Sequence, residues 1–182
     1  YYGGSSKRSM KNLDLANKRK NAWGTGLIFN HAIDSIQNVT VAAGFTREIS
    51  ENANNTAYYR NAYGLGLAYN FVHTTYGLDL ERQVTKNQGD KRTKNEVRAI
   101  VRQGLNEDWN VYAMYAYKTD KQFGDTDRTR QFMVGTEYYV YNQGSLKVKP
   151  FLEWQATRTK YENSTVDRSR DFKTVIGLRA YW

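Results

Sequence analysis

Basic side chains recur at every second or fourth position in several parts of this sequence, a spacing that places them on one face of an extended strand. Arg98 and Arg102 form one such pair, and Lys147 and Lys149 form another. Rings of arginine and lysine side chains allow a pore to select anions. We therefore predict a basic ladder that attracts anionic solutes and consists of Arg98, Arg102, Lys147, Lys149 and Arg179.

The face that would carry this ladder also carries carboxylates, so its net charge is close to zero. The basic residues that we assign to this face, as candidates for lining a lumen and binding solute, are Arg60, Arg98, Arg102, Lys118, Lys147, Lys149, Lys173 and Arg179. Its acidic residues are Glu48, Asp79, Glu81, Glu96, Glu137, Glu153 and Asp171. Opposite charges on neighbouring strands attract one another. An ion-pair network that fills and stiffens the wall is therefore the alternative to an anion-binding ladder.

No set of residues in the sequence has the pattern of an enzyme active site. The only histidines are His31 and His73, and neither lies beside a recognisable serine motif. A hydrolase needs a nucleophile within reach of a base and of an orienting group. Two histidines without any cysteine also supply no metal-ligand set. We predict that the chain is not an enzyme and that it binds no cofactor and no metal ion.

The elements that would position these charges are β-strands that cross a membrane. Apolar and polar residues alternate along nine segments, each close to the roughly 9–11 residues of a tilted membrane strand. No run reaches the roughly 18–20 apolar residues of a membrane-spanning helix, and a bilayer otherwise admits only closed barrels. We predict an all-β fold, an antiparallel transmembrane β-barrel with strands at residues 21–30, 36–48, 57–70, 73–84, 95–105, 109–118, 128–141, 146–158 and 170–182.

Composition agrees with such a barrel. The mean hydropathy is low, at −0.80, because only one face of each barrel strand is apolar. The formal net charge is +9, but the aromatic residues alternate along strands and do not cluster with the cations, so we predict no nucleic-acid partner. Residues 1–20 contain six basic residues and one acidic residue. We expect them to form an external loop that contacts the phosphates of lipopolysaccharide.

The connections between the segments predict how the barrel lies in the membrane. Outer-membrane barrels have short periplasmic turns and longer external loops. The shorter connections lie at residues 30–35, 70–73, 106–108 and 142–145, and the longer, charged ones lie at residues 49–56, 85–94, 119–127 and 159–169. The segment 170–182 then ends in the periplasm. Single-chain bacterial barrels have even strand counts, so we expect at least one further strand, ten or more in total, and a single domain that is the C-terminal part of a larger barrel. The alternative is a barrel that closes at ten strands with an almost absent first strand.

The four tryptophans are candidates for the aromatic girdles at the two membrane interfaces. With this topology, Trp23 and Trp154 lie toward the outer interface, and Trp109 and Trp182 lie at the inner interface. Amphipathic aromatic rings prefer the level of the headgroups. The alternative is a soluble β-sandwich that holds the four tryptophans in its core.

Alternation, turns and the terminal aromatic Trp182 make the chain resemble Gram-negative outer-membrane barrels in general, in which such an aromatic is where barrel assembly factors dock. The last 35 residues are similar to the oligogalacturonate-specific and sialic-acid-related porin family. That similarity rests on Val148, Lys149, Pro150, Phe151, Leu152, Glu153 and Trp154, followed by Arg158 and by Val175, Ile176, Gly177, Leu178 and Arg179. The resemblance implies a lumen whose arginines and lysines conduct acidic sugars.

Three functions are compatible with this fold. The first is an outer-membrane channel for passive passage of small hydrophilic solutes, acidic and sugar-like ones among them. The second is the membrane translocator of a larger polysaccharide-export or protein-secretion protein. The third is a surface adhesin or phage receptor that uses basic, tyrosine-rich outer loops. All three place the chain in the bacterial outer membrane, in contact with lipid, lipopolysaccharide and the barrel assembly machinery.

Overall fold

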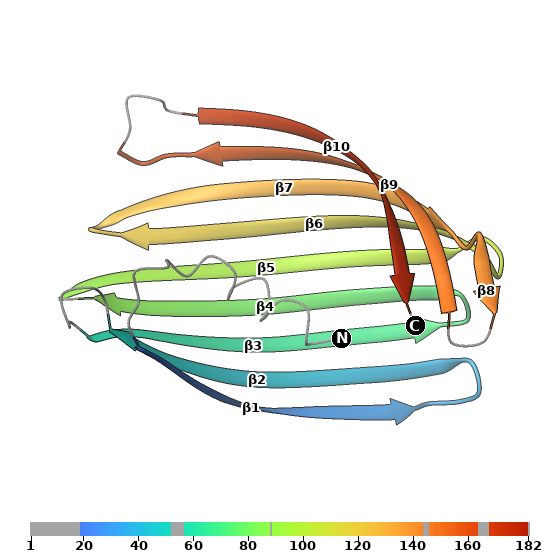
Figure 1. Cartoon of the computed structure of the whole chain (residues 1–182), viewed down its shortest axis with the longest axis horizontal. Helices are drawn as coiled ribbons and strands as arrows, with labels where there is room; N and C mark the ends of the chain where they lie inside the picture. The colour runs from blue at the N-terminus through green and yellow to red at the C-terminus, as the bar shows by residue number, and fades with distance from the viewer. Residues whose placement is uncertain (1–18, 52–56, 88, 144–145, 164–167, 182) are drawn as a thin grey trace.

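The chain folds as one antiparallel β-sheet (Figure 1). A computed structural model describes residues 19–51, 57–87, 89–143, 146–163 and 168–181. Among these residues no helix is long and apolar enough to cross a membrane. The strands are β1 (Arg19–Ala32), β2 (Gln37–Glu51), β3 (Ala57–Phe71), β4 (Thr74–Asn87), β5 (Asp90–Gly104), β6 (Trp109–Gln122), β7 (Asp125–Tyr138), β8 (Tyr141–Gln143), β9 (Leu146–Lys160) and β10 (Arg168–Tyr181).

The strands follow one another in the sheet in the order of the sequence. Nine of them form the continuous path β1-β2-β3-β4-β5-β6-β7-β9-β10, and the short β8 pairs only with β9. Every neighbouring pair is antiparallel. The predicted all-β antiparallel architecture is therefore confirmed, and each predicted segment corresponds to one strand of this path.

Cross-strand pairing places apolar residues beside apolar residues on one face of the sheet. One row of directly paired positions crosses all nine strands and contains only apolar or aromatic side chains: Phe29, Val41, Leu67, Leu78, Ala99, Tyr115, Phe132, Ala156 and Phe172. We call this row and the apolar positions beside it the apolar belt. Most of its large side chains are exposed, up to 80% for Leu27 and 81% for Ile176, so no described part of the chain covers this face.

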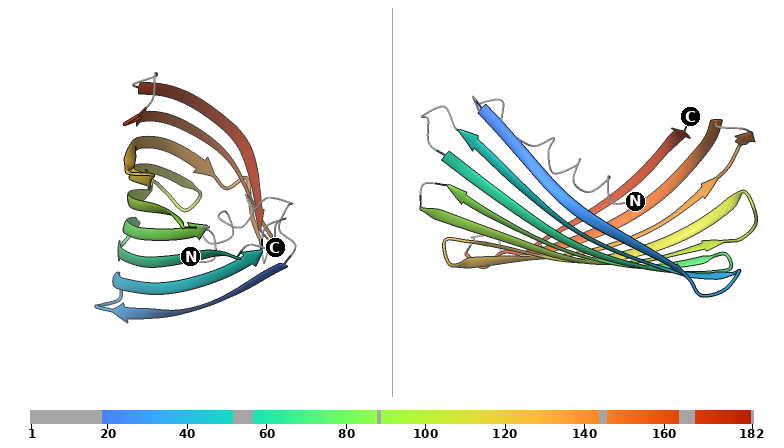
Figure 2. Two further views of the ribbon diagram at one scale, coloured as in Figure 1. Left: turned by 90° about the vertical axis from the view of Figure 1, so that its left-hand side faces the viewer. Right: turned by 90° about the horizontal axis from the view of Figure 1, so that it is seen from below.

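The sheet bends into a trough that has β1 and β10 along its two edges (Figure 2). The apolar belt occupies the convex face. The residues that alternate with the belt positions along each strand face the concave side. The most buried side chains lie there, among them Ala116, Glu137 and Lys149. Because successive side chains alternate between faces, the period-two pattern of the sequence becomes one apolar and one charged surface.

The strands are longer than predicted at the end that carries the β4–β5 and β6–β7 turns. The expected loops at residues 85–94 and 119–127 are wrong, since β4 ends at Asn87, β5 begins at Asp90, β6 ends at Gln122 and β7 begins at Asp125. Phe123 and Gly124 form a two-residue turn with φ angles of 52° and 95°, and positive φ at both positions suits a tight hairpin. The expected alternation of short and long connections is therefore absent.

Three smaller predictions also need correction. His31 lies within β1 and not in the following turn, and its ring stacks on Phe29 with centroids 6.2 Å apart. The predicted strand 128–141 is divided, because β7 ends at Tyr138 and Tyr141 begins β8. Of the expected external loop 1–20, residues 1–18 lie outside the described residues, and residues 19 and 20 belong to β1.

The described strands do not close into a barrel. β1 pairs only with β2, and β10 pairs only with β9. Because the path has nine strands and every pair is antiparallel, β1 and β10 run in the same direction. Each of these two strands therefore has one edge without a described partner.

Candidate functional site: the charged wall of the concave face

The predicted lumen residues share the concave face, as their parity required. Arg60 lies on β3, Arg98 and Arg102 on β5, Lys118 on β6, Lys149 on β9, and Lys173 and Arg179 on β10. Lys147 belongs to β9, but its side chain lies outside the described residues. We call this set, with the carboxylates on the same face, the charged wall. It extends over β2 to β10.

Glu137 on β7 is the centre of the tightest cluster in the charged wall. Its side chain is 3% exposed and accepts from Lys149 Nζ at 3.2 Å and from Arg179 Nη1 at 3.0 Å. The guanidinium of Arg102 also contacts its Oε1. Three cations from β5, β9 and β10 therefore converge on one buried carboxylate, and charge-assisted contacts of this kind are the stronger ones in proteins.

Glu153 on β9 joins this cluster through two donors. Arg179 Nη2 lies 2.6 Å from its Oε1, and the Tyr112 hydroxyl donates to the same oxygen at 2.6 Å. Tyr112 belongs to β6, so its ring crosses β7 to reach β9. Gly135 permits this crossing, because a Cβ added there would lie 2.5 Å from the Tyr112 ring.

Aromatic rings hold two of the cations from a second side. Lys149 Nζ lies 4.3 Å from the centroid of the Tyr139 ring, and the Arg179 guanidinium carbon lies 4.0 Å from that of Phe151. Such cation–π contacts add attraction to the ion pairs. The Phe151 ring also lies over Gly177, where an added Cβ would be 2.5 Å from the ring. The cluster is thus packed as well as charge-paired.

A second cluster lies further along the same wall and is acidic overall. Arg98 Nη2 lies 2.6 Å from Glu96 Oε1 and its Nη1 lies 3.9 Å from Asp79, while Lys118 Nζ lies 3.4 Å from Glu96 Oε2. Glu81 pairs directly across the strands with Glu96. The two cations Arg98 and Lys118 therefore share their surroundings with three carboxylates.

Ion pairs also occur outside these two clusters. Arg60 Nη1 lies 3.7 Å from Glu48, and its Nη2 donates to the Tyr58 hydroxyl at 2.9 Å. Near the β4–β5 and β6–β7 turns, Arg92 Nε donates to Asp120 at 2.7 Å, and Lys94 Nζ lies 3.6 Å from the same carboxylate. This last group was not among the predicted lumen residues, because both segments were expected to be loops, although Arg92 and Lys94 have the period-two spacing of a strand.

Near the middle of β1 to β3, the concave face has small side chains in place of charged ones. Register brings Gly26, Gly44 and Gly64 side by side, and the neighbouring row contains Ala42 and Gly66. The trough therefore has one wall of small side chains and one charged wall. A solute in the trough would have space on one side and charge on the other.

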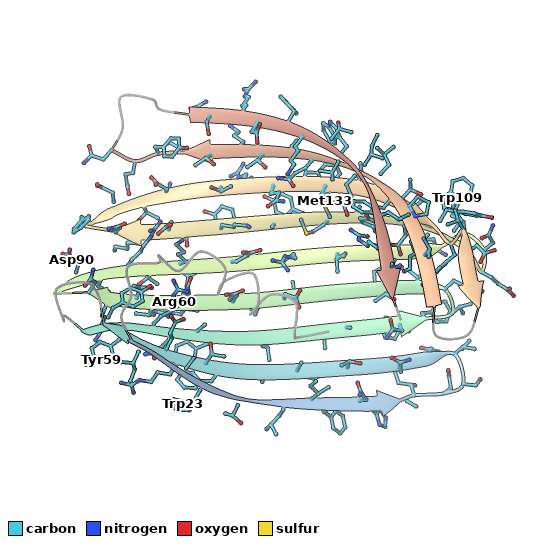
Figure 3. All side chains as sticks on the ribbon, viewed as in Figure 1. Trp23, Tyr59, Arg60, Asp90, Trp109 and Met133 are labelled. Atoms are coloured by element: carbon cyan, nitrogen blue, oxygen red, sulfur yellow. The ribbon has the colours of Figure 1, made fainter. Side chains whose placement is uncertain are left out.

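The tryptophans of the convex face do not all lie at strand ends. Trp23 lies near the start of β1 and Trp109 is the first residue of β6, so the two are at opposite ends of the sheet (Figure 3). Trp154 lies near the middle of β9, between the rings of Phe132 and Phe172, whose centroids are 6.5 and 6.1 Å away. Trp182 lies outside the described residues. A position near a membrane interface stays a prediction for Trp23, Trp109 and Trp154.

No protein-family model and no curated protein sequence matches this chain. The described residues contain no group of three or more His, Cys, Asp and Glu that could hold a metal ion. Arg98, Lys118 and Arg179 are paired yet keep 31%, 39% and 34% of their side chains exposed, so they can contact a solute and a carboxylate together.

Proposed function

We propose that this chain forms the wall of an outer-membrane β-barrel that passes small hydrophilic solutes, acidic sugar-like ones among them. The observation that carries the proposal is the apolar belt: one row of nine apolar positions runs unbroken across the convex face, opposite a charged concave face. A soluble sheet of this size would bury such a face against a second layer. A lipid-exposed barrel has its apolar side outward and its polar side inward.

The proposal requires closure of the sheet by strands beyond those that the structure describes. Unpaired backbone groups cost several kcal/mol each in hydrocarbon, so the free edges of β1 and β10 need partners. Because these two strands run in the same direction, an odd number of additional strands closes the barrel with antiparallel pairs throughout. With nine strands on the path, the total then becomes even, as in single-chain bacterial barrels.

Acidic solutes are favoured by the cluster around Glu137. Three cations face two carboxylates there, and Arg102 and Arg179 keep 35% and 34% of their side chains exposed. A solute carboxylate can share these guanidinium groups, whose planar donors match carboxylate geometry. The similarity of the last strands to the oligogalacturonate-specific porin family implies the same class of solute.

Conductance of the full-length protein in planar bilayers tests the proposal. We expect discrete channels whose reversal potential in a salt gradient indicates anion preference, and this preference should fall or reverse in Arg98→Glu/Arg102→Glu because rings of basic side chains select anions. The matched control is Lys86→Glu/Lys91→Glu, which changes the same charge on the convex face. A protein that inserts into the bilayer but conducts no current would overturn the channel proposal and favour the surface-receptor alternative. Large channels without ion preference would favour the translocator.

A further inference from the structure

Six basic side chains form a regular array on the convex face of β7, β9 and β10. In one row Arg130 pairs with Arg158, and Arg158 pairs with Arg170. In the next row Arg128 pairs with Lys160, and Lys160 pairs with Arg168. We call these six residues the cation grid. All six side chains are exposed, and the charged wall lies on the opposite face of the same strands.

Within the described residues, the cation grid has no counter-charge on the convex face of its own strands. Like charges directly opposite one another on neighbouring strands destabilise a sheet. Every Asp and Glu of β7, β9 and β10 lies at a position that faces the concave side. Within the described part of the chain, none of the six cationic side chains forms an ion pair or a hydrogen bond. In the adjacent β9–β10 connection, Glu162 accepts from the backbone N–H of Thr126. An external anion would relieve the repulsion in the array.

The cation grid adjoins the apolar belt at one end of the sheet only. The next row of paired positions is Phe132, Ala156 and Phe172, which belongs to the belt. At the other end of the convex face, where Trp109 pairs with Tyr138, none of the described positions is Asp, Glu, Lys or Arg. A lipid leaflet with phosphate headgroups matches the order of apolar and basic residues at the first end and not at the second.

A shallow pocket joins the two surfaces. Its volume is about 210 Å³, and its lining includes Arg130, Arg158 and Arg170 beside the rings of Tyr115, Phe132 and Phe172. Guanidinium groups bind phosphate with two parallel N–H donors. The aromatic rings below them offer apolar surface to an acyl chain. One pocket can thus contact both parts of a phosphorylated lipid.

We propose that the cation grid binds the phosphorylated headgroup of a glycolipid in the outer leaflet, with Arg130, Arg158 and Arg170 on the phosphate. The proposal rests on the membrane-spanning function proposed above. It assigns lipid binding to strand residues of the convex face, in addition to the basic segment at residues 1–20. It also orients the sheet, because the end with the cation grid becomes the outer end.

Native mass spectrometry of the full-length protein in detergent, titrated with bisphosphorylated lipid A, tests this site. In Arg130→Gln/Arg158→Gln/Arg170→Gln we expect the affinity for lipid A to fall by at least about tenfold. Each arginine guanidinium contributes a charge-assisted contact with the phosphate. Lys86→Gln/Lys91→Gln/Lys121→Gln is the matched control. It removes three convex-face charges from β4, β5 and β6 and should change retention by less than about twofold. The triple Arg→Lys variant keeps the positive charges but loses the paired N–H donors of the guanidinium groups. Its affinity for lipid A should lie between those of the glutamine variant and the control variant.

Two results would overturn the site. Equal weakening by the control variant would mean that only total charge matters, and equal binding of dephosphorylated lipid A would mean that phosphate is not recognised. If the glutamine variant does not fold, the Arg→Lys variant gives the decision by itself, and its unchanged binding counts against the site. Bilayer conductance of the unmodified protein separates the two proposals. An unmodified protein that forms channels but retains no lipid A refutes only the cation grid, whereas one that retains lipid A but conducts no current refutes only the channel.

Discussion

Glu137 is almost fully buried among three cations, and it is the carboxylate that Arg102, Lys149 and Arg179 share. Glu137→Gln should leave Arg102, Lys149 and Arg179 without their shared counter-charge. Removing one partner of a buried ion pair costs about 3–5 kcal/mol, so we expect the urea midpoint of the folded protein to fall and anion preference in bilayers to rise. Asp171→Asn is the control, since Asp171 is exposed on the same face and forms no ion pair within the described residues. An unchanged midpoint in Glu137→Gln would contradict this role.

Gly135 contributes to the same cluster by its lack of a side chain, which leaves room for the Tyr112 ring. In Gly135→Val the added side chain should displace that ring and break the hydrogen bond from Tyr112 to Glu153. A hydrogen bond to a charged group contributes about 1.5–3 kcal/mol, and the steric conflict adds to this, so Gly135→Val should be less stable than Tyr112→Phe. The comparison of urea midpoints checks this order. If Tyr112→Phe were the less stable of the two, the hydrogen bond would matter more than the space above Gly135.

At the scale of the strand, the convex face of β3 has one position inside the apolar belt and another near the end of the strand that can be compared. Leu65 pairs with Ala43 and Leu80 inside the belt, and Tyr59 lies near the start of the strand. An arginine at the bilayer midplane of a barrel costs about 2–4 kcal/mol and near the interface about 0–1 kcal/mol. Leu65→Arg should therefore make folding into lipid vesicles less favourable, and by far more than Tyr59→Arg does. Equal effects of the two substitutions would argue against a membrane-embedded belt.

At the scale of the whole molecule, the two free edges are the feature that distinguishes an open sheet from a closed barrel. If further strands complete the barrel, the backbone N–H groups of β1 and β10 in the full-length protein are all hydrogen-bonded, as those of the central β5 are. Hydrogen–deuterium exchange in micelles should then be as slow in β1 and β10 as in β5, because exchange requires opening of the local structure. Fast exchange limited to β1 and β10 would show that the edges remain open.

The sequence by itself determined the strands and their two faces, because a period of two is a local property that each segment carries independently. It identified the members of the charged wall for the same reason, Glu137 and Arg179 among them. It failed where strands extend beyond the apolar belt. At residues 85–94 both faces are polar, so alternation of hydrophobicity disappears although the backbone pairing of β4 and β5 continues.

Only the tertiary structure decided which of these side chains meet. Arg102, Glu137 and Arg179 belong to β5, β7 and β10, and their contacts depend on the register of every pair between those strands. Register is a non-local property that hydrogen bonding and turn geometry set together. The same register aligned Arg130, Arg158 and Arg170 into a row without counter-charge. Separately in the sequence, these arginines look like ordinary strand-end residues.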